Sequence, residues 1–190
     1  MDITIDNSQI TEAEIGWLAG ILDGEGSIIL SNTKVPVSKE RYQHAERIQY
    51  APKITMVNTD PELIAKYVKL LDKLGVGCGV YEKNSVNRLG NKQQWQVMVS
   101  RMKSVKIFLD LLLPHLTCKK AKAELLLRFI NLRLNKVGAK GMTNEDRAYS
   151  TEEIDVCNQF RNLRDYTCDP VYRDDIVRPV PRGTESSRND

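Results

Sequence analysis

A helix with glycines along one face constrains this chain more than any other feature of its sequence. Gly16, Gly20 and Gly24 recur every fourth residue within an apolar segment, and that spacing places them on one side of a helix. Each interior glycine costs about 1 kcal/mol of helix stability relative to alanine, so the fold must offset this cost. Because small residues let two helix backbones approach closely, we expect a tight helix–helix contact along this face.

An acidic residue follows the last of these glycines. If the partner helix belongs to a second copy of the chain, the contact is isologous and two Glu25 side chains meet near the twofold axis. Neighbouring carboxylates repel one another, and divalent metal ions relieve that repulsion. Mg²⁺ combines a few carboxylates with water and phosphate oxygens, so such a site suits phosphodiester hydrolysis. The alternative is tight packing inside a monomer, without any catalytic role.

Capping signals and hydrophobic periodicity predict an α+β fold around one four-stranded, mostly antiparallel sheet. Thr11 with Glu14 and Ser150 with Glu153 form capping boxes, and Asp60 precedes a proline at a helix start. The expected elements are helix 12–23, strands 28–33 and 47–58, helix 61–74, strands 76–83 and 93–101, and helices 103–113, 118–134 and 151–166. Polar loops are expected at 34–46 and 84–91, and a flexible joint at 138–141.

Period-two alternation assigns side chains to the two faces of this sheet. Apolar residues such as Ile54, Met56, Val97 and Val99 point to the helices, and Pro52 indicates a bulge or an edge. The other face carries donors and acceptors suited to base edges in a major groove, although an ordinary hydrated face is the alternative. The candidates for base contacts are Ile29, Ser31, Thr33, Gln49, Lys53, Thr55, Gln94, Gln96 and Met98, and those for phosphate contacts are Lys34, Lys39 and Arg47. For the third strand, either Tyr81 and Lys83 or Cys78 and Glu82 face the same way.

Composition restricts the class of protein further. The chain has 190 residues and a net charge of +3, enough for one domain with a core but uninformative about nucleic acid. It contains neither a membrane-length apolar segment nor a signal peptide, so we expect an intracellular protein, in a prokaryotic cytoplasm or an organelle. Four cysteines without a CxxC pair favour reduced thiols over zinc or disulfides. Two histidines are too few for a histidine-rich metal site, and no Walker-type phosphate loop occurs.

The stretch from Leu18 to Gly26, Leu-Ala-Gly-Ile-Leu-Asp-Gly-Glu-Gly, resembles the motif of LAGLIDADG homing endonucleases. Trp17 before it and Ser27-Ile28 after it also fit, and the order of elements extends the resemblance over about 12–134. The resemblance implies the αββαββα endonuclease fold, with extra C-terminal helices. Because the motif occurs once, it implies a homodimer that cuts both strands of a long, near-palindromic DNA target. It also implies Mg²⁺ as cofactor, with Mn²⁺ substituting and Ca²⁺ supporting binding without cleavage.

The resemblance also assigns roles to individual residues. It makes Glu25 the catalytic, metal-binding acid and Gly24 a metal ligand through its carbonyl, while Asp23 is a capping or hydrogen-bonding residue. A polar residue ending the second strand is expected near the metal-bound water, and we choose Asn58 with Thr59 as the alternative. The family's catalytic basic residue corresponds to Lys119, with Lys120 and a pair of solvated surface lysines as alternatives. The expected dimer contacts are Gly16, Ala19, Gly20 and Asp23.

The predicted organisation is an endonuclease core at 1–136, a helical extension of the same domain at 137–168 and a loosely ordered tail at 169–190. Double-stranded DNA and a second copy of the chain are the expected partners, with no membrane and no small-molecule substrate. Two other functions fit the same scaffold: an RNA maturase that assists intron splicing, and a DNA-binding regulator that does not cleave. The retained acid Glu25 argues against the regulator.

Overall fold

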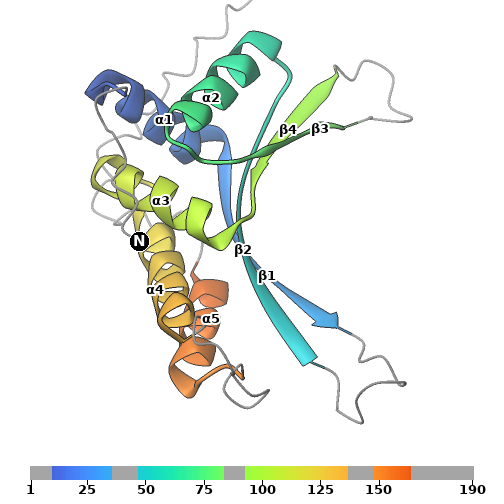
Figure 1. Ribbon diagram of the computed structural model, residues 1–190, viewed down its shortest axis with the longest axis vertical. Helices are drawn as coiled ribbons and strands as arrows, with labels where there is room; N and C mark the ends of the chain where they lie inside the picture. Colours follow the sequence, from blue (N-terminus) through green and yellow to red (C-terminus); the bar gives the residue numbers. More distant parts are fainter. Residues whose placement is uncertain (1–9, 36–46, 84–92, 137–147, 164–190) are drawn as a thin grey trace, which may run out of the picture.

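The computed structural model describes residues 10–35, 47–83, 93–136 and 148–163. Its elements follow the predicted order of a helix, two strands, a helix, two strands and further helices (Figure 1). They are α1 (Glu12–Glu25), β1 (Gly26–Val35), β2 (Arg47–Asn58), α2 (Pro61–Lys73), β3 (Gly79–Lys83), β4 (Gln94–Val99), α3 (Met102–Leu112), the short 3₁₀ helix η2 (Leu113–His115), α4 (Lys120–Lys136) and α5 (Thr151–Asn162). The predicted loop at 34–46 differs at its start, because β1 continues to Val35. The remainder of that loop, the loop at 84–91, the joint at 138–141 and the tail lie outside the described residues.

The four strands form one antiparallel sheet in the order β1-β2-β4-β3. Figure 1 shows the helices gathered on one face of this sheet, while the sheet curves and leaves its opposite face uncovered. The predicted four-stranded antiparallel sheet is thus confirmed. We call the uncovered side the open face.

One part of the sheet has only two strands. β4 pairs with residues 54–58 of β2, whereas β1 pairs with β2 along its whole length, from Gly26 opposite Met56 to Val35 opposite Arg47. Residues 29–35 of β1 and 47–53 of β2 therefore extend beyond the four-stranded part, and we call this pair the arm. Pro52 lies in the arm, where no strand among the described residues pairs with the second side of β2, so the predicted edge position is confirmed.

The core lies between the helices and the covered face of the sheet. Ile54, Met56, Val97 and Val99 are each 1% exposed, which confirms the predicted inward row of β2 and β4. Ile48, in the same row, is 44% exposed because it lies near the end of the arm. Hydrophobic residues from α1, α2, α3, α4 and α5 complete the core.

The predicted helix starts are confirmed in detail. Both capping boxes form, at Thr11 with Glu14 and at Ser150 with Glu153, and the Asp60 side chain accepts hydrogen bonds from the first turn of α2. The end of α2 explains why β3 begins later than predicted. Gly75 has a φ of 64°, and Val76 N donates to Leu71 O at 2.9 Å, so the chain makes a left-handed turn before it extends.

Among the described residues, no helix has the length and apolarity needed to cross a membrane.

α5 packs on α4 through ion pairs that join Arg128 to Glu152 and Arg133 to Glu153. The division of the chain at 136 and 168 stays a prediction.

Candidate active site

The motif helix ends where the candidate site begins. Glu25 is the last residue of α1 and is exposed, and Gly26 starts β1 without an intervening loop. A Cβ added to Gly26 would lie 2.5 Å from Leu22 Cδ1 and 2.9 Å from the Leu22 backbone. Only glycine permits this sharp transition from helix to strand, and the transition fixes the position of Glu25 beside the sheet.

Asn58 and Glu25 are in direct contact. Asn58 Nδ2 donates a hydrogen bond to Glu25 Oε2 at 2.8 Å, and Asn58 Oδ1 accepts one from the backbone N–H of Asp60 at 2.9 Å. The second bond fixes which way the amide faces, so its donor end is directed at the carboxylate. Thr59, the alternative to Asn58, lines the same open pocket of about 330 Å³ together with Glu25 and Gln94. The structure thus brings the two predicted residues together, while the catalytic role of Asn58 stays a prediction.

Asp23 and Lys119 join the end of α1 to the start of α4. The Asp23 carboxylate accepts hydrogen bonds from the backbone N–H groups of Thr117, Cys118 and Lys119 at 2.7, 3.2 and 3.0 Å. In return, Lys119 Nζ donates to the carbonyls of Leu22 at 2.9 Å and Asp23 at 2.6 Å. We call these reciprocal contacts the clasp. Asp23 thus satisfies backbone donors just before α4, and Lys119 binds carbonyls in the last turn of α1, where the Leu22 carbonyl also accepts from the N–H of Gly26.

The clasp distinguishes between the structural roles that were predicted for Lys119 and Asp23. Lys119 is only 6% exposed, so the view of it as a solvated surface lysine is wrong. Its ammonium group lies at the carbonyl end of α1, where a helix favours positive charge. Lys120 is exposed and begins α4 itself. The hydrogen-bonding role predicted for Asp23 is confirmed, although its partners lie in the segment just before α4 and not in α1.

The oxygen donors at this site suit Mg²⁺, but one chain supplies few of them. Because Lys119 binds the carbonyls of Leu22 and Asp23, the Gly24 carbonyl and the Glu25 carboxylate are the next oxygens along α1. Both are hard ligands, which Mg²⁺ prefers, with water and phosphate completing its shell. Within the described ranges, no group of three or more histidine, cysteine, aspartate or glutamate side chains could hold a metal.

The glycine face of α1 is open in the single chain. Gly16, Gly20 and Gly24 are exposed, and a Cβ added at each would meet no atom of the described residues within 4 Å. Ala19 is different: it is 1% exposed and lies in the core with Leu18 and Leu22, so its predicted place at the dimer contact is wrong. The physical reason is that Ala19 lies about 100° around the helix from the middle of the glycine face, on the flank that packs into the core.

The register of the sheet shows which side chains share the open face. Ile29 lies opposite Lys53, Thr33 opposite Gln49, and Thr55 opposite Met98. Because side chains alternate along each strand, these residues and Ser31, Gln94 and Gln96 point away from the helices, as predicted. Tyr81 pairs with Gln96 and Lys83 with Gln94, which settles the open choice for the third strand in favour of Tyr81 and Lys83.

Some predicted DNA contacts do not fit. Thr55 is only 7% exposed, in the middle of the sheet between Ser27 and Met98, so its side chain offers little surface for a direct contact. Lys34 is exposed at the end of the arm and alternates with Thr33, so it lies off the open face, and its predicted phosphate contact stays a prediction. Lys39 and the side chain of Arg47 lie outside the described residues. Tyr81 and Lys83 join the candidate DNA contacts on the open face. Their strand is too short for alternation to show which side chains face outward, but its pairing partners on β4 decide this.

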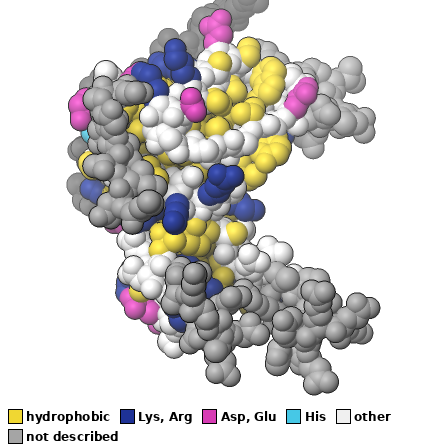
Figure 2. Space-filling model, viewed as in Figure 1, with side chains coloured by type: hydrophobic (Ala, Val, Ile, Leu, Met, Phe, Trp, Pro, Cys, Tyr) yellow, Lys and Arg dark blue, Asp and Glu magenta, His cyan; other side chains and the backbone are white. Residues whose placement is uncertain are grey.

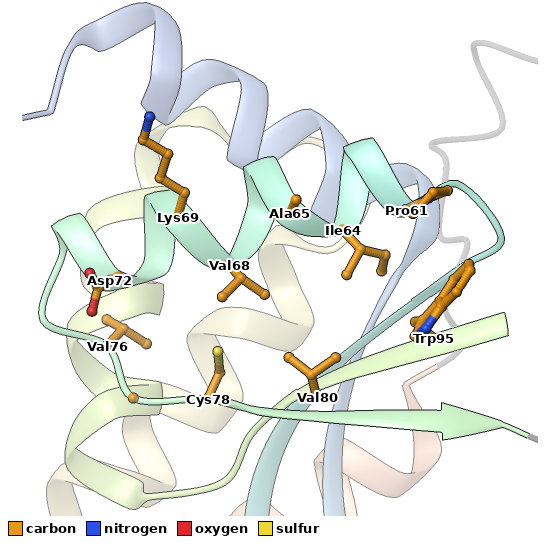
Figure 3. Close-up of a pocket in the computed structure, with 11 residues that line it drawn as sticks. Pro61, Ile64, Ala65, Val68, Lys69, Asp72, Val76, Cys78, Val80 and Trp95 are labelled. Carbon is orange, nitrogen blue, oxygen red and sulfur yellow. The ribbon is translucent and has the colours of Figure 1, made fainter.

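A larger pocket of about 890 Å³ lies on the helix side, between α2 and the β3–β4 pair. Figure 3 shows Ile64 and Val68 on α2 facing Val80 and Trp95 on the strands. Figure 2 shows hydrophobic side chains gathered on the upper part of the molecule, where α2 and β3 lie. Glu25 and Asn58 do not line this pocket, so it is separate from the candidate site.

Comparison with known proteins identifies relatives of this arrangement. The model of the LAGLIDADG-like domain matches residues 12–112, which is more than half of the chain. No curated protein matches the sequence.

Two solved structures with TM-scores above 0.5 support the fold, and a third match is weaker. The group I intron-encoded homing endonuclease I-CeuI complexed with DNA is 16% identical, with a TM-score of 0.55 over 84% of this chain and 72% of that one. The LAGLIDADG homing endonuclease I-GzeII in complex with a DNA target is 17% identical, with a TM-score of 0.52 over 93% of this chain and 54% of that one. The homing endonuclease I-CvuI is 20% identical over 80% of this chain and 98% of its own, with a TM-score of 0.48.

Proposed function

Because the chain belongs to the LAGLIDADG-like domain family, we propose that it is a homing endonuclease that hydrolyses phosphodiester bonds in double-stranded DNA at a specific site. The observation that carries this proposal is the contact between Glu25 and Asn58 at the end of the glycine helix. It places a carboxylate with a fixed orientation beside an open sheet face that is rich in donors and acceptors. A non-catalytic role would not require this arrangement at the junction of helix and sheet.

The active form is a homodimer joined along the glycine face of α1. Two observations support this: the face is exposed in one chain, and one chain contributes a single carboxylate to the site. An isologous contact through Gly16 and Gly20 would bring a second Glu25 close to the first. Two symmetric sites then act on the two strands of a near-palindromic target.

The residues of the site divide the chemistry among themselves. Glu25 and the Gly24 carbonyl would hold Mg²⁺, which when bound activates water and stabilises the leaving oxygen. Asn58 fixes the rotamer of Glu25 through its 2.8 Å hydrogen bond. Lys119, anchored at the end of α1, places positive charge near the reacting phosphate and stabilises the charge that develops there.

The open face would bind the major groove. Gln49, Gln94 and Gln96 can each donate and accept, which suits adenine, while Lys53 and Lys83 can donate to guanine. Phosphate contacts position the protein but carry no sequence information, so we assign specificity to the open face. We expect Mn²⁺ to substitute for Mg²⁺ and Ca²⁺ to support binding without cleavage.

The decisive experiment is a cleavage selection on a randomised, near-palindromic DNA library, with Mg²⁺ and Ca²⁺ compared. We expect double-strand cuts at a recoverable site with Mg²⁺ only. Glu25→Gln should retain specific binding and lose at least 100-fold in single-turnover rate, on the order expected when a main catalytic interaction is removed. Glu124→Gln makes the same change at an exposed helix position and should cut normally.

Three results would contradict the proposal in different ways. Normal cutting by Glu25→Gln would remove Glu25 from the chemistry. Specific binding without any cut by the natural sequence would indicate a regulator. Tight binding to a structured intron RNA, with no binding to any duplex DNA, would indicate a maturase.

A further inference from the structure

The arm needs support that its own two strands do not provide. A two-stranded antiparallel ribbon is marginally stable in water, and within the part of the chain that the structure describes, no strand pairs with the second edge of β2 in the arm. Successive N–H groups of a strand point alternately to its two sides. The N–H positions of Tyr50 and Pro52 therefore point to the same side of β2 as that of Ile54, where β4 begins to pair. Pro52 has no N–H to offer. The N–H of Tyr50 is therefore a donor that must find its acceptor outside the sheet.

The acceptor comes from the C-terminal part of the chain. Tyr50 N donates to the hydroxyl oxygen of Tyr149 at 3.0 Å, across 99 positions of sequence. The two rings meet edge to face at 5.0 Å between centroids, and the Tyr149 ring also stacks on Phe129 of α4 at 6.2 Å. Tyr50 itself meets Phe129 at 6.1 Å. Tyr149 thus contacts both the arm and α4, and Figure 1 shows α4 and α5 beside the half of the sheet that the arm forms.

Tyr149 is itself held firmly on both sides. Lys136 Nζ donates to the carbonyl of Ala148 at 2.7 Å, and Ser150 N donates to Glu153 Oε2 at 2.7 Å. Arg133 lies over the Tyr149 ring at 4.3 Å and pairs with Glu153, which is 1% exposed. Because these contacts fix the backbone and the ring, the hydroxyl is presented to the arm in a defined position.

We propose that Tyr149 is a positioning residue that holds the arm against α4 and α5 and thereby sets DNA specificity. The side chains whose geometry it would control are the predicted DNA contacts on the open face of the arm, Ile29, Ser31, Thr33, Gln49 and Lys53. The part concerning DNA rests on the proposed function, whereas the support of the arm does not. Tyr149 lies beyond residues 12–112, which match the family model.

The test uses Tyr149→Phe in the full chain, because phenylalanine keeps the ring and removes only the hydroxyl. Amide exchange measured by NMR should be roughly tenfold faster at Tyr50, as expected for the loss of one hydrogen bond. Glu152→Gln is the matched control: it breaks an exposed α4–α5 ion pair that does not touch the arm, and Tyr50 exchange should be unchanged.

The same two variants are then compared on the DNA site selected by the natural sequence. For Tyr149→Phe, the ratio of specific to non-specific affinity should fall about tenfold, the equivalent of that one hydrogen bond. The single-turnover rate at saturating DNA should be unchanged, because Tyr149 lies away from Glu25. This separation of binding from chemistry would not follow from a general loss of folding.

Three outcomes overturn the inference or part of it. Unchanged Tyr50 exchange in Tyr149→Phe would show that the hydroxyl does not support the arm. Faster exchange with an unchanged affinity ratio would overturn the role in specificity. Absence of any specific site for the natural sequence would overturn the proposed function and the specificity role with it, while the exchange measurement would still decide on the support of the arm.

Discussion

Asn58 connects three parts of the molecule through one side chain. It ends β2, its oxygen accepts from the N–H of Asp60 just before α2, and its amide nitrogen donates to Glu25 at the end of α1. A shorter side chain would leave Glu25 free to sample other rotamers, with a loss of preorganisation at the site. Its importance therefore comes from orientation rather than from charge.

We predict that Asn58→Ala lowers the single-turnover cleavage rate about 10- to 100-fold, the size expected when a catalytic group loses its orientation. Specific DNA binding should persist, because Asn58 lies apart from the base-facing rows of the arm. Asn131→Ala, at an exposed position of α4, serves as the control. An unchanged cleavage rate for Asn58→Ala would show that Glu25 does not depend on this hydrogen bond.

For individual residues, strand alternation and the motif predicted the features that depend only on neighbouring sequence. Strand alternation placed Asn58 inward at the end of β2, and the motif pointed to Glu25, so their contact agrees with the sequence. The burial of Thr55 was not predictable, because alternation gives a face but not how much neighbouring strands cover it. The anchoring of Lys119 depends on the end of α1 meeting the segment before α4, which no local pattern encodes.

At the scale of elements, the clasp joins the end of α1 to the segment that leads into α4. α4 begins without a serine, threonine, asparagine or aspartate of its own at the N-cap, where Lys119 stands. Asp23 instead binds the backbone N–H groups of residues 117–119 just before this helix, and Lys119 binds carbonyls at the end of α1. The relative position of the two helices, and with it that of Glu25, therefore depends on this pair.

We expect Asp23→Ala to reduce the free energy of unfolding by about 1–3 kcal/mol, because backbone donors at the start of α4 lose their acceptor. Asp23→Asn should cost less, since its amide oxygen still accepts. Urea denaturation followed by circular dichroism measures both. Asp155→Ala, at an exposed position of α5, should change stability by less than about 0.5 kcal/mol. Equal stability of Asp23→Ala and the natural sequence would mean that other groups cap α4.

The order and type of the elements followed from the sequence because caps and periodicity are local. Thr11, Asp60 and Ser150 each mark a helix start that the structure confirms. The arm was not foreseen, since the lengths over which strands pair depend on the whole sheet. Likewise, the glycine spacing identified the open side of α1, but the burial of Ala19 required knowing where the core lies.

At the scale of the whole molecule, the glycine face is available for a symmetric contact. Each glycine in α1 costs helix stability that the single chain does not recover through close packing, since an added Cβ at Gly20 meets no described atom within 4 Å. Docking of a second α1 would use this space. The helix stability that these glycines cost would thus be offset by the contact between two subunits.

We predict that Gly20→Leu yields a folded monomer. Leucine is a better helix former than glycine by nearly 1 kcal/mol, so the chain itself should be at least as stable as before. The bulky side chain would keep two α1 helices apart. Sedimentation velocity should then show a dimer for the natural sequence and a monomer for Gly20→Leu, with cleavage lost.

Ala121→Leu, an exposed position of α4, controls for the addition of a leucine to a helix surface and should remain dimeric. A dimer of Gly20→Leu with full activity would place the subunit contact on another surface.

The clasp also sets an order for events during synthesis. Its contacts join Asp23 to residues 94 to 96 positions later, so a long loop must close before they form. While the ribosome is still translating the sheet, the end of α1 lacks Lys119 and the start of α4 does not yet exist. The clasp can therefore form only after residue 119 has left the ribosome. A nascent chain that has completed β1, β2, β3 and β4 already contains Glu25 and Asn58, but it still lacks the contacts that join the end of α1 to the segment before α4.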